Sequence, residues 1–253
     1  NNTELLSVMV WFYGGAFVAG STNEARYDGR NLSKQANVIV VSLNYRVGVY
    51  GFMASEQLGK EDPQWASSGN YGLLDQIQAL KWIKENIRAF GGDPEKITIF
   101  GQSAGASSVC YHLLMPMSKG LFNRAIMQSG SCAFPVGVKG ARANNLYKQT
   151  DQNSAYDSSA KFMKKLQCSS LECLRNKTEI EINGNQNSTD LLIWPVVDGK
   201  VIPDDPYILL RNGNFNRVDI IIGTNEDDGS LFKPSEASFS YENKLKELFP
   251  LHH

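Results

Sequence analysis

The segment best suited to covalent chemistry is a G-x-S-x-G pattern at residues 101–105. A serine hydroxyl is a weak nucleophile, so a serine enzyme exposes its oxygen on a tight turn, supplies a base and donates hydrogen bonds to the oxyanion. Gly101 and Gly105 leave room for such a turn around Ser103, and the N–H of Ala104 stands where the next helix begins. The pattern favours acyl transfer, and the alternative is a glycine-rich connection with an incidental serine.

A second glycine-rich segment, YGGAF at residues 13–17, directly follows an apolar run. Small residues allow successive backbone N–H groups to turn inward and hold a negative oxygen, as the glycine loop of esterases does. Alone, the segment would be an ordinary glycine turn. With the G-x-S-x-G pattern about 90 residues further on, the two interpretations support each other.

Strands and helices must alternate to position these two segments. Apolar and β-branched runs predict strands at 5–13, 38–45, 96–100, 124–128 and 218–222, with the first buried and the second buried on both faces. Periodic apolar residues and stop signals predict helices at 31–35, at 73–90 ending before Gly91, and from the G-x-S-x-G turn to Pro116. This order predicts an α/β fold with a mainly parallel central sheet flanked by helices.

The chain reads as a single domain in three stretches. Residues 1–140 hold both glycine-rich segments, 141–190 form a polar excursion of surface helices and loops, and 191–253 return to the sheet. No repeat interrupts this order.

Composition excludes several classes of function. The chain has 253 residues, of which 42% are hydrophobic, and its net charge of −1 gives no long-range field that would attract nucleic acid. Its longest apolar stretch, residues 5–13, is too short to cross a bilayer, and no spacing of Cys or His suggests a metal or other cofactor. The chain starts at Asn1 rather than Met and enters a strand almost at once, so we expect it to be part of a longer protein.

Several blocks closely resemble the type-B carboxylesterase and cholinesterase family. They lie in family order at 11–17, 43–48, 69–76, 90–94, 97–105, 128–131 and 223–230. The resemblance implies an α/β-hydrolase fold whose N- and C-terminal parts are missing from this chain. It also implies hydrolysis of carboxylic esters by a Ser-acid-His triad.

The family's site residues carry over position by position. Ser103 matches the nucleophile, and Gly15, Ala16 and Ala104 match the three backbone donors of the oxyanion hole. Asp228 matches the triad acid, where many relatives carry the longer Glu.

Ser129 matches a buried serine that supports the acid, and an ordinary polar core residue is the equal alternative. The triad runs Ser, acid, His, so the base must follow the acid, and only His252 and His253 do. They lack the glycine-bearing loop that the family places around its catalytic histidine. His112 matches a histidine of the family that is not catalytic. We therefore expect the base to lie outside this chain, and the chain alone to be inactive.

Three positions bear on the substrate. Gln102 replaces the Glu that cholinesterases carry before the nucleophile, and Val18 and Val136 replace aromatic residues. These differences favour a general carboxylesterase acting on small carboxylic esters over a choline-specific enzyme. The rival function is a catalytically silent cholinesterase-like recognition or adhesion domain, and a thioesterase would use the same residues.

Cysteines and glycosylation motifs indicate the compartment. Cys168 and Cys173 resemble a disulfide of the family, Cys110 is expected to be a buried helix thiol, and Cys132 is expected to be free. N-x-[ST] acceptors for glycosylation occur at Asn1, Asn31, Asn176 and Asn187. Together they predict a secreted glycoprotein.

Overall fold

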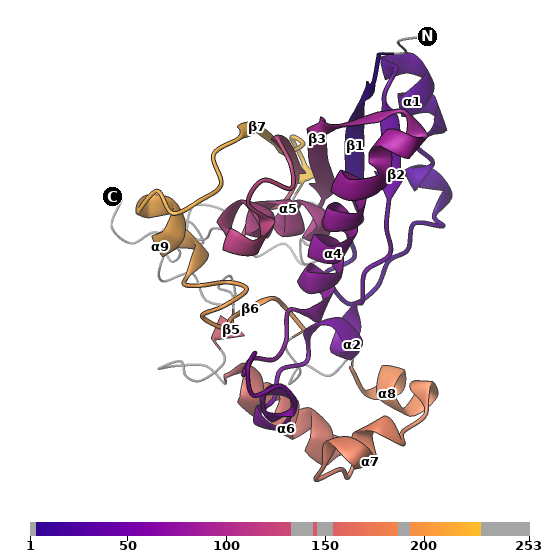
Figure 1. Ribbon diagram of the computed structural model, residues 1–253. Helices are drawn as coiled ribbons and strands as arrows, with labels where there is room; N and C mark the ends of the chain where they lie inside the picture. The colour runs from indigo at the N-terminus through magenta and orange to yellow at the C-terminus, as the bar shows by residue number, and fades with distance from the viewer. Residues whose placement is uncertain (1–3, 133–143, 146–153, 187–192, 229–253) are drawn as a thin grey trace.

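One parallel sheet organises the molecule. The computed structural model describes residues 4–132, 144–145, 154–186 and 193–228. Within them, five strands run parallel in the order β2-β1-β3-β4-β7 (Figure 1). The strands are β1 (Leu6–Phe12), β2 (Ile39–Ser42), β3 (Gly92–Gln102), β4 (Arg124–Gln128) and β7 (Asp219–Gly223). The mainly parallel sheet flanked by helices, predicted from the sequence, is confirmed.

Helices fill the connections between these strands. The α-helices are α1 (Arg30–Ala36), α2 (Gly48–Phe52), α3 (Glu56–Glu61), α4 (Tyr71–Asn86), α5 (Ala104–Leu114), α6 (Ala155–Lys165), α7 (Leu171–Arg175), α8 (Glu179–Gln186) and α9 (Pro206–Arg211). Short 3-10 turns are η1 (Ala25–Tyr27), η2 (Ile87–Phe90) and η3 (Pro116–Ser118). A small second sheet pairs β5 (Asn144–Asn145) with β6 (Val196–Val197).

The core lies where α4 and α5 meet one face of the sheet. Side chains alternate along β1, and Val8, Val10 and Phe12 are fully buried in this core. Burying each such side chain stabilises the fold by roughly 1.5–3 kcal/mol. The opposite residues of β1 are half-buried.

The prediction that the second strand is buried on both faces is wrong. The residues of β2 are half-buried or exposed, because β2 stands at the edge of the sheet and pairs with β1 alone. It also ends at Ser42, three positions before the predicted end, because Tyr45 turns away to stack on Tyr13.

The helix predicted at 73–90 is α4 followed by the tighter turn η2. Gly91 ends it with a left-handed φ of 83°, as its type predicts. The next strand begins earlier than predicted, since Gly92 already pairs with Leu6 of β1.

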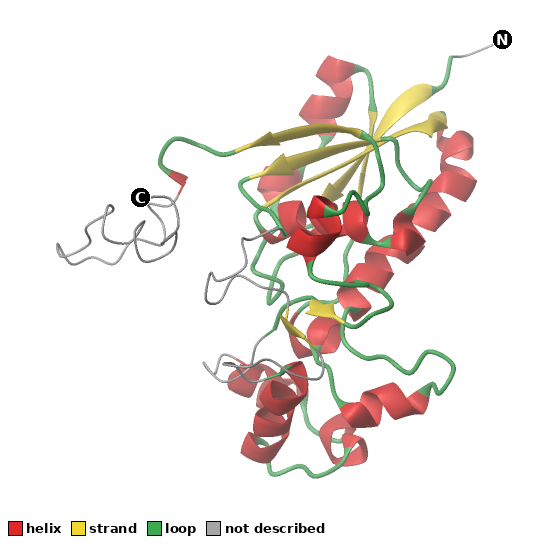
Figure 2. Cartoon of the chain, turned by 90° about the vertical axis from the view of Figure 1, so that its left-hand side faces the viewer, coloured by secondary structure: helices red, strands yellow, loops and turns green. Residues whose placement is uncertain are grey.

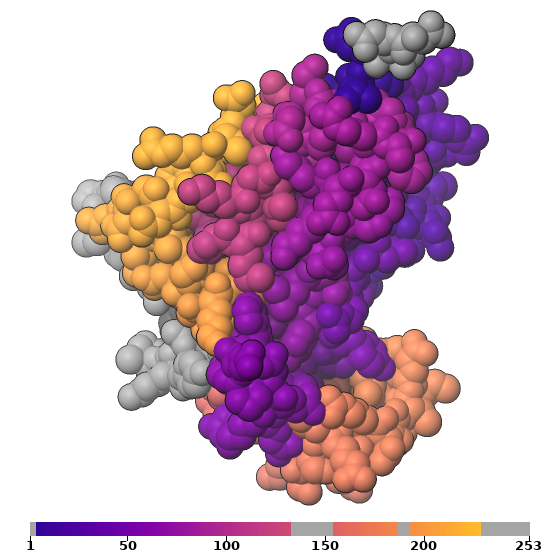
Figure 3. All heavy atoms as spheres, viewed as in Figure 1, coloured from indigo at the N-terminus to yellow at the C-terminus, as the bar shows by residue number. Residues whose placement is uncertain are grey.

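The described helices of the polar excursion form a layer away from the five-stranded sheet. Helices α6, α7 and α8 lie at the lower end of the molecule in Figure 1, and Figure 2 also shows helices at this end and the five-stranded sheet at the upper end. The space-filling view shows this segment packed against the chain around α3 (Figure 3), where Arg175 forms a salt bridge of 2.6 Å with Glu61. Gln57 also accepts a hydrogen bond of 3.0 Å from the N–H of Leu171.

Candidate active site

The predicted nucleophile occupies a strained turn between β3 and α5. Ser103 has φ 55° and ψ −124°, a backbone conformation that non-glycine residues rarely adopt. A Cβ atom added to Gly105 would lie 2.0 Å from the carbonyl oxygen of Phe12, and one added to Gly101 would lie 2.5 Å from the carbonyl carbon of Gly105. Both glycines are therefore required by close backbone approach. Ser103 itself is partly exposed.

Backbone hydrogen bonds hold this turn on both sides. The N–H of Ser103 donates to the carbonyl of Gln128 at 3.0 Å, which ties the turn to the end of β4. Its carbonyl accepts from the N–H of Ser107 at 2.9 Å, the first bond of α5. The N–H of Ala104 is thus placed at the N-terminus of a buried helix, where the helix dipole favours negative charge.

The predicted oxyanion loop lies directly against the turn. A Cβ added to Gly14 would lie 3.1 Å from the Cβ of Ser103 and 2.8 Å from the carbonyl oxygen of Gln102. Gly15 and Ala16 follow with φ 118° and 53°, and both are exposed. Within the described part of the chain, the N–H groups of Gly15 and Ala16 have no hydrogen-bond acceptor. Two free donors beside a serine hydroxyl are what an oxyanion hole needs.

Aromatic residues anchor both ends of this loop. At one end Tyr13 stacks on Tyr45 with ring centroids 4.3 Å apart, and each hydroxyl donates to the other's carbonyl, at 2.9 and 2.6 Å. At the other end Phe17 is fully buried and packs edge-on against Phe52 and Trp194. Burial raises the pKa of both tyrosines, so both hydroxyls stay protonated as donors.

The predicted acid follows β7, the neighbour of β4. Asp228 is partly exposed, and one carboxylate oxygen lies 3.4 Å from the N–H of Asn225. The N–H of Ser129 donates to the carbonyl of Gly223 at 2.8 Å, so residue 129 links β7 to the segment beside Ser103. Ser129 has a left-handed φ of 53° and is half-buried rather than buried. These bonds bring the acid's strand to the edge that carries Ser103.

His112 is unsuited to act as the base. It is fully buried in α5, with Nδ1 2.8 Å from the Ser118 hydroxyl and Nε2 3.0 Å from the Gln76 side-chain oxygen. Burial lowers its pKa to about 3, so the ring is neutral at pH 7. His252 and His253 lie outside the described residues.

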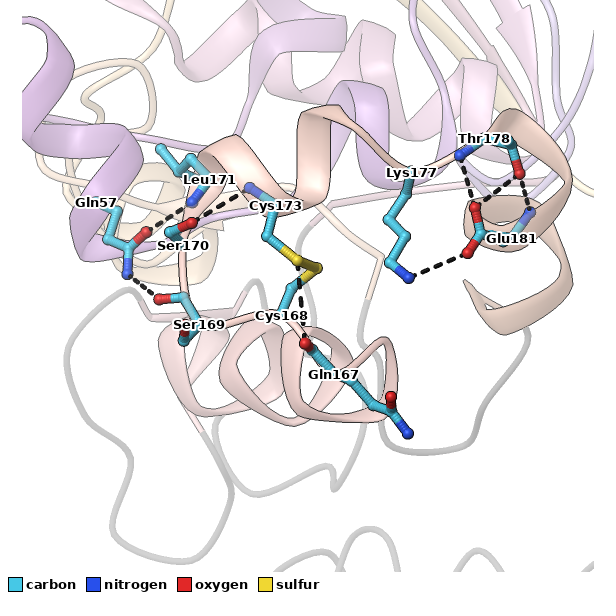
Figure 4. The surroundings of a disulfide bond; sticks show 10 residues. All are labelled: Gln57, Gln167, Cys168, Ser169, Ser170, Leu171, Cys173, Lys177, Thr178 and Glu181. Carbon is cyan, nitrogen blue, oxygen red and sulfur yellow. Dashed lines mark hydrogen bonds and ion pairs between the residues drawn. A yellow bond between two sulfur atoms is a disulfide. The ribbon is translucent and has the colours of Figure 1, made fainter.

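The cysteine predictions need one correction. Cys110 and Cys132 form a disulfide with Cα atoms 5.5 Å apart, so Cys132 is not free and Cys110 is not a thiol. Sequence reasoning missed this pair because 22 positions separate its members and only the fold brings α5 beside the end of β4. Cys168 and Cys173 form the second disulfide, between α6 and α7 (Figure 4).

A cavity of about 370 Å³ opens on the other face of the sheet, at the same edge. Trp11, Tyr27 and Phe100 line this cavity; the ring centroid of Trp11 lies 5.2 Å from that of Tyr27 and 4.9 Å from that of Phe100. Gln102 and Gln128 line it on the side toward the serine turn. The sequence pattern predicts strands at Trp11 and Phe100 and gives no sign of a cavity there, because only the fold brings Tyr27 beside them.

Two candidate glycosylation residues are visible at the surface. Asn31 in the first turn of α1 and Asn176 after α7 are exposed, whereas Asn1 and Asn187 lie outside the described residues. No cluster of three potential metal ligands occurs in the described ranges. None of the helices described there is long and apolar enough to cross a membrane.

Comparison with known proteins agrees with this geometry. Residues 1–249 match the model of the carboxylesterase family. Cholinesterase 2 of Branchiostoma lanceolatum is 39% identical over 241 residues, which cover 89% of this chain and 65% of the relative. Para-nitrobenzyl esterase of Bacillus subtilis is 39% identical over 227 residues, which cover 90% of this chain and 45% of the relative.

A solved structure of PNB esterase superposes with a TM-score of 0.77 at 36% identity, covering 97% of this chain and 51% of that one. The chain thus spans from about two fifths to about two thirds of the length of the curated relatives it matches. The match to the family model over nearly the whole sequence and the shared α/β-hydrolase fold place this chain in the carboxylesterase family.

Proposed function

We propose that the protein hydrolyses carboxylic esters through an acyl-enzyme formed on Ser103. The observation that carries this proposal is the contact between the strained serine turn and the exposed glycine loop, with the Cβ position of Gly14 3.1 Å from the Cβ of Ser103. Strain of this kind persists at functional sites, where it holds a nucleophile in place.

The reaction follows from the arrangement of donors and nucleophile. The Ser103 hydroxyl oxygen attacks the ester carbonyl, and the base takes its proton. The carbonyl oxygen becomes an oxyanion that accepts hydrogen bonds from the N–H groups of Gly15, Ala16 and Ala104. Collapse expels the alcohol, which receives the proton from the base, and water then releases the acid by the same steps. Each oxyanion donor is worth roughly 10²–10³ in rate.

Asp228 is the proposed acid, with the base a histidine that the described residues do not contain. The position of Asp228 after β7, next to the β4 end that holds Ser103, supports its role. The burial and low pKa of His112 exclude the one histidine within the described ranges. We place the base outside the 253 residues, which would leave this chain alone essentially inactive.

The proposed substrates are general carboxylic esters rather than choline esters. Gln102 is exposed at the site and carries no charge to favour a cation. Val18, which is 37% exposed beside the oxyanion loop, presents an aliphatic rather than an aromatic surface. We also propose that the protein is secreted and glycosylated, which its two disulfides and the exposed Asn31 and Asn176 support.

A panel of esters tests the proposal. The longest protein product that contains these 253 residues should hydrolyse p-nitrophenyl acetate and prefer it over a choline ester, and Ser103→Ala should abolish turnover. The 253-residue chain should show no turnover above the Ser103→Ala background. No turnover in the longer product would favour the silent recognition domain, and a preference for thioesters would favour a thioesterase.

A further inference from the structure

The disulfide between Cys110 and Cys132 stands on the same side of α5 as the nucleophile. The N-cap residue Ser103 and the helix residues Ser107 and Cys110 lie on one side of α5, since they are four and three positions apart. Each is linked to residues 128–132, which are the last residue of β4 and the segment that follows it. The N–H of Ser103 donates to the Gln128 carbonyl at 3.0 Å, and the Ser107 hydroxyl donates to the Ser131 carbonyl at 2.9 Å. The disulfide is the last of the three links.

The linked segment touches both the nucleophile and the strand of the proposed acid. A Cβ on Gly130 would lie 2.4 Å from the carbonyl oxygen of Ser103, so the segment passes directly against the turn. Its Ser129 N–H donates to the Gly223 carbonyl of β7 at 2.8 Å. A shift of residues 129–132 away from α5 would therefore move Ser103 relative to the strand that leads to Asp228.

The hydrogen bonds at positions 103 and 107 can open one at a time, whereas the disulfide cannot. Cys110 and Cys132 are 4% and 3% exposed, so their bond lies within the packed interior rather than on a mobile surface loop. Ser129 also holds a left-handed φ of 53°, which a free segment would tend to relax. A covalent link at the end of this segment keeps both the strained residue and the close contact at Gly130 in place.

We propose that Cys110 and Cys132 are positioning residues: their disulfide clamps residues 128–132 onto α5 and thereby fixes the nucleophile turn. The other disulfide, Cys168–Cys173, joins the turn after α6 to α7 in the helical layer and has no part in this clamp. The catalytic meaning of the clamp rests on the proposed esterase function, but the clamp itself does not.

Amide hydrogen exchange tests the clamp without any measurement of activity. The reporters are the N–H groups of Ser103 and Ser107, and the reference is Val10 in the centre of the sheet. In Cys110→Ala/Cys132→Ala, exchange at both reporters should accelerate by about five-fold or more relative to Val10. In the matched control Cys168→Ala/Cys173→Ala, their ratio to Val10 should stay as in the wild type. A smaller change in the first variant, or an equal change in the control, overturns the proposal.

A second variant keeps the test decisive if the first fails to fold. Ser107→Ala removes the neighbouring hydrogen bond and leaves the disulfide in place. The exchange of Ser103 relative to Val10 should then change by less than about five-fold, because the covalent link still holds the segment. A larger acceleration would assign the clamp to the hydrogen bond and contradict the role of the disulfide. Because the clamp is read from exchange alone, a wild-type protein that fails to hydrolyse esters would overturn the proposed function and not the clamp.

Discussion

Substituting alanine for Gly105 gives a test in which the structure and helix propensity predict opposite signs. Gly105 is the second residue of α5, where alanine would ordinarily stabilise a helix by up to about 1 kcal/mol. Here the added Cβ would lie 2.0 Å from the Phe12 carbonyl oxygen, 2.7 Å from its carbon and 2.9 Å from the Tyr13 carbonyl oxygen. All three are backbone atoms, which no rotamer change can move aside.

Ordinary van der Waals contact begins near 3.4 Å, whereas the added Cβ would lie 2.0 Å from the Phe12 carbonyl oxygen. To restore ordinary contact, α5 would have to move away from the end of β1 by about the difference, 1.4 Å. Such overpacking typically costs about 1–3 kcal/mol. We expect Gly105→Ala to lower the free energy of unfolding in urea by about that amount. The matched control is Gly184→Ala in α8, where nothing lies within 4 Å of the added Cβ, and it should be neutral or slightly stabilising.

In the longest protein product that contains these residues, the same substitution should also reduce ester hydrolysis, because the proposed oxyanion loop follows the end of β1. A displacement of about 1 Å at a reacting centre can cost about 10²-fold in rate. Gly105→Ala with wild-type stability, or with greater stability than Gly184→Ala, would refute the close approach of helix and strand described here.

Three further predictions concern buried polar groups. Burial lowers the folded-state pKa of His112 from 6.5 to about 3, so as the pH falls the unfolded state binds a proton that the folded state does not. The free energy of unfolding should therefore fall between pH 6.5 and pH 3, by up to about 1.4 kcal/mol per pH unit. In urea unfolding across this range, His112→Gln should show a shallower dependence of stability on pH, and an identical dependence would contradict the burial of a neutral histidine. Asn70 is fully buried; its side-chain NH2 donates to the Val196 carbonyl at 2.8 Å, and its side-chain oxygen accepts from the Val196 N–H at 2.9 Å. Asn70→Ala should lower the free energy of unfolding by about 2–3 kcal/mol in thermal unfolding. A loss under about 0.5 kcal/mol would be inconsistent with these two bonds. Tyr45→Phe removes the hydroxyl that donates to the Tyr13 carbonyl at 2.6 Å, and it should lower the free energy of unfolding in urea by about 1–2 kcal/mol. The control Tyr50→Phe changes a side chain that is 46% exposed and should leave the free energy of unfolding almost unchanged.

The sequence was sufficient to predict the sheet and the serine turn for local reasons. The β-branched run before Gly101 and the apolar residues after it specify strand, turn and helix without reference to the rest of the chain. The strand at 124–128 is confirmed at both ends, since its apolar residues are bounded by polar ones. These features depend on neighbours in sequence.

Features that depend on tertiary contact could not be predicted in the same way. β2 reads as a doubly buried strand, but its burial is decided by its place at the sheet edge. The pairing of Cys110 with Cys132 follows from the packing of α5 beside β4. The stacking of Tyr13 on Tyr45 joins residues 32 positions apart. None of these leaves a periodic signal in the sequence.

The most direct measurement of the central claim is covalent labelling of the proposed nucleophile, Ser103. The longest protein product that contains these 253 residues would be treated with a fluorophosphonate, and the modified peptide identified by mass spectrometry. Ser103 should carry one phosphonyl group, with fluoride released, and Ser103→Ala should remain unlabelled while Ser107→Ala labels normally. An adduct on another serine, or no adduct on a folded protein, would contradict the assignment of Ser103 as the nucleophile of an ester hydrolase.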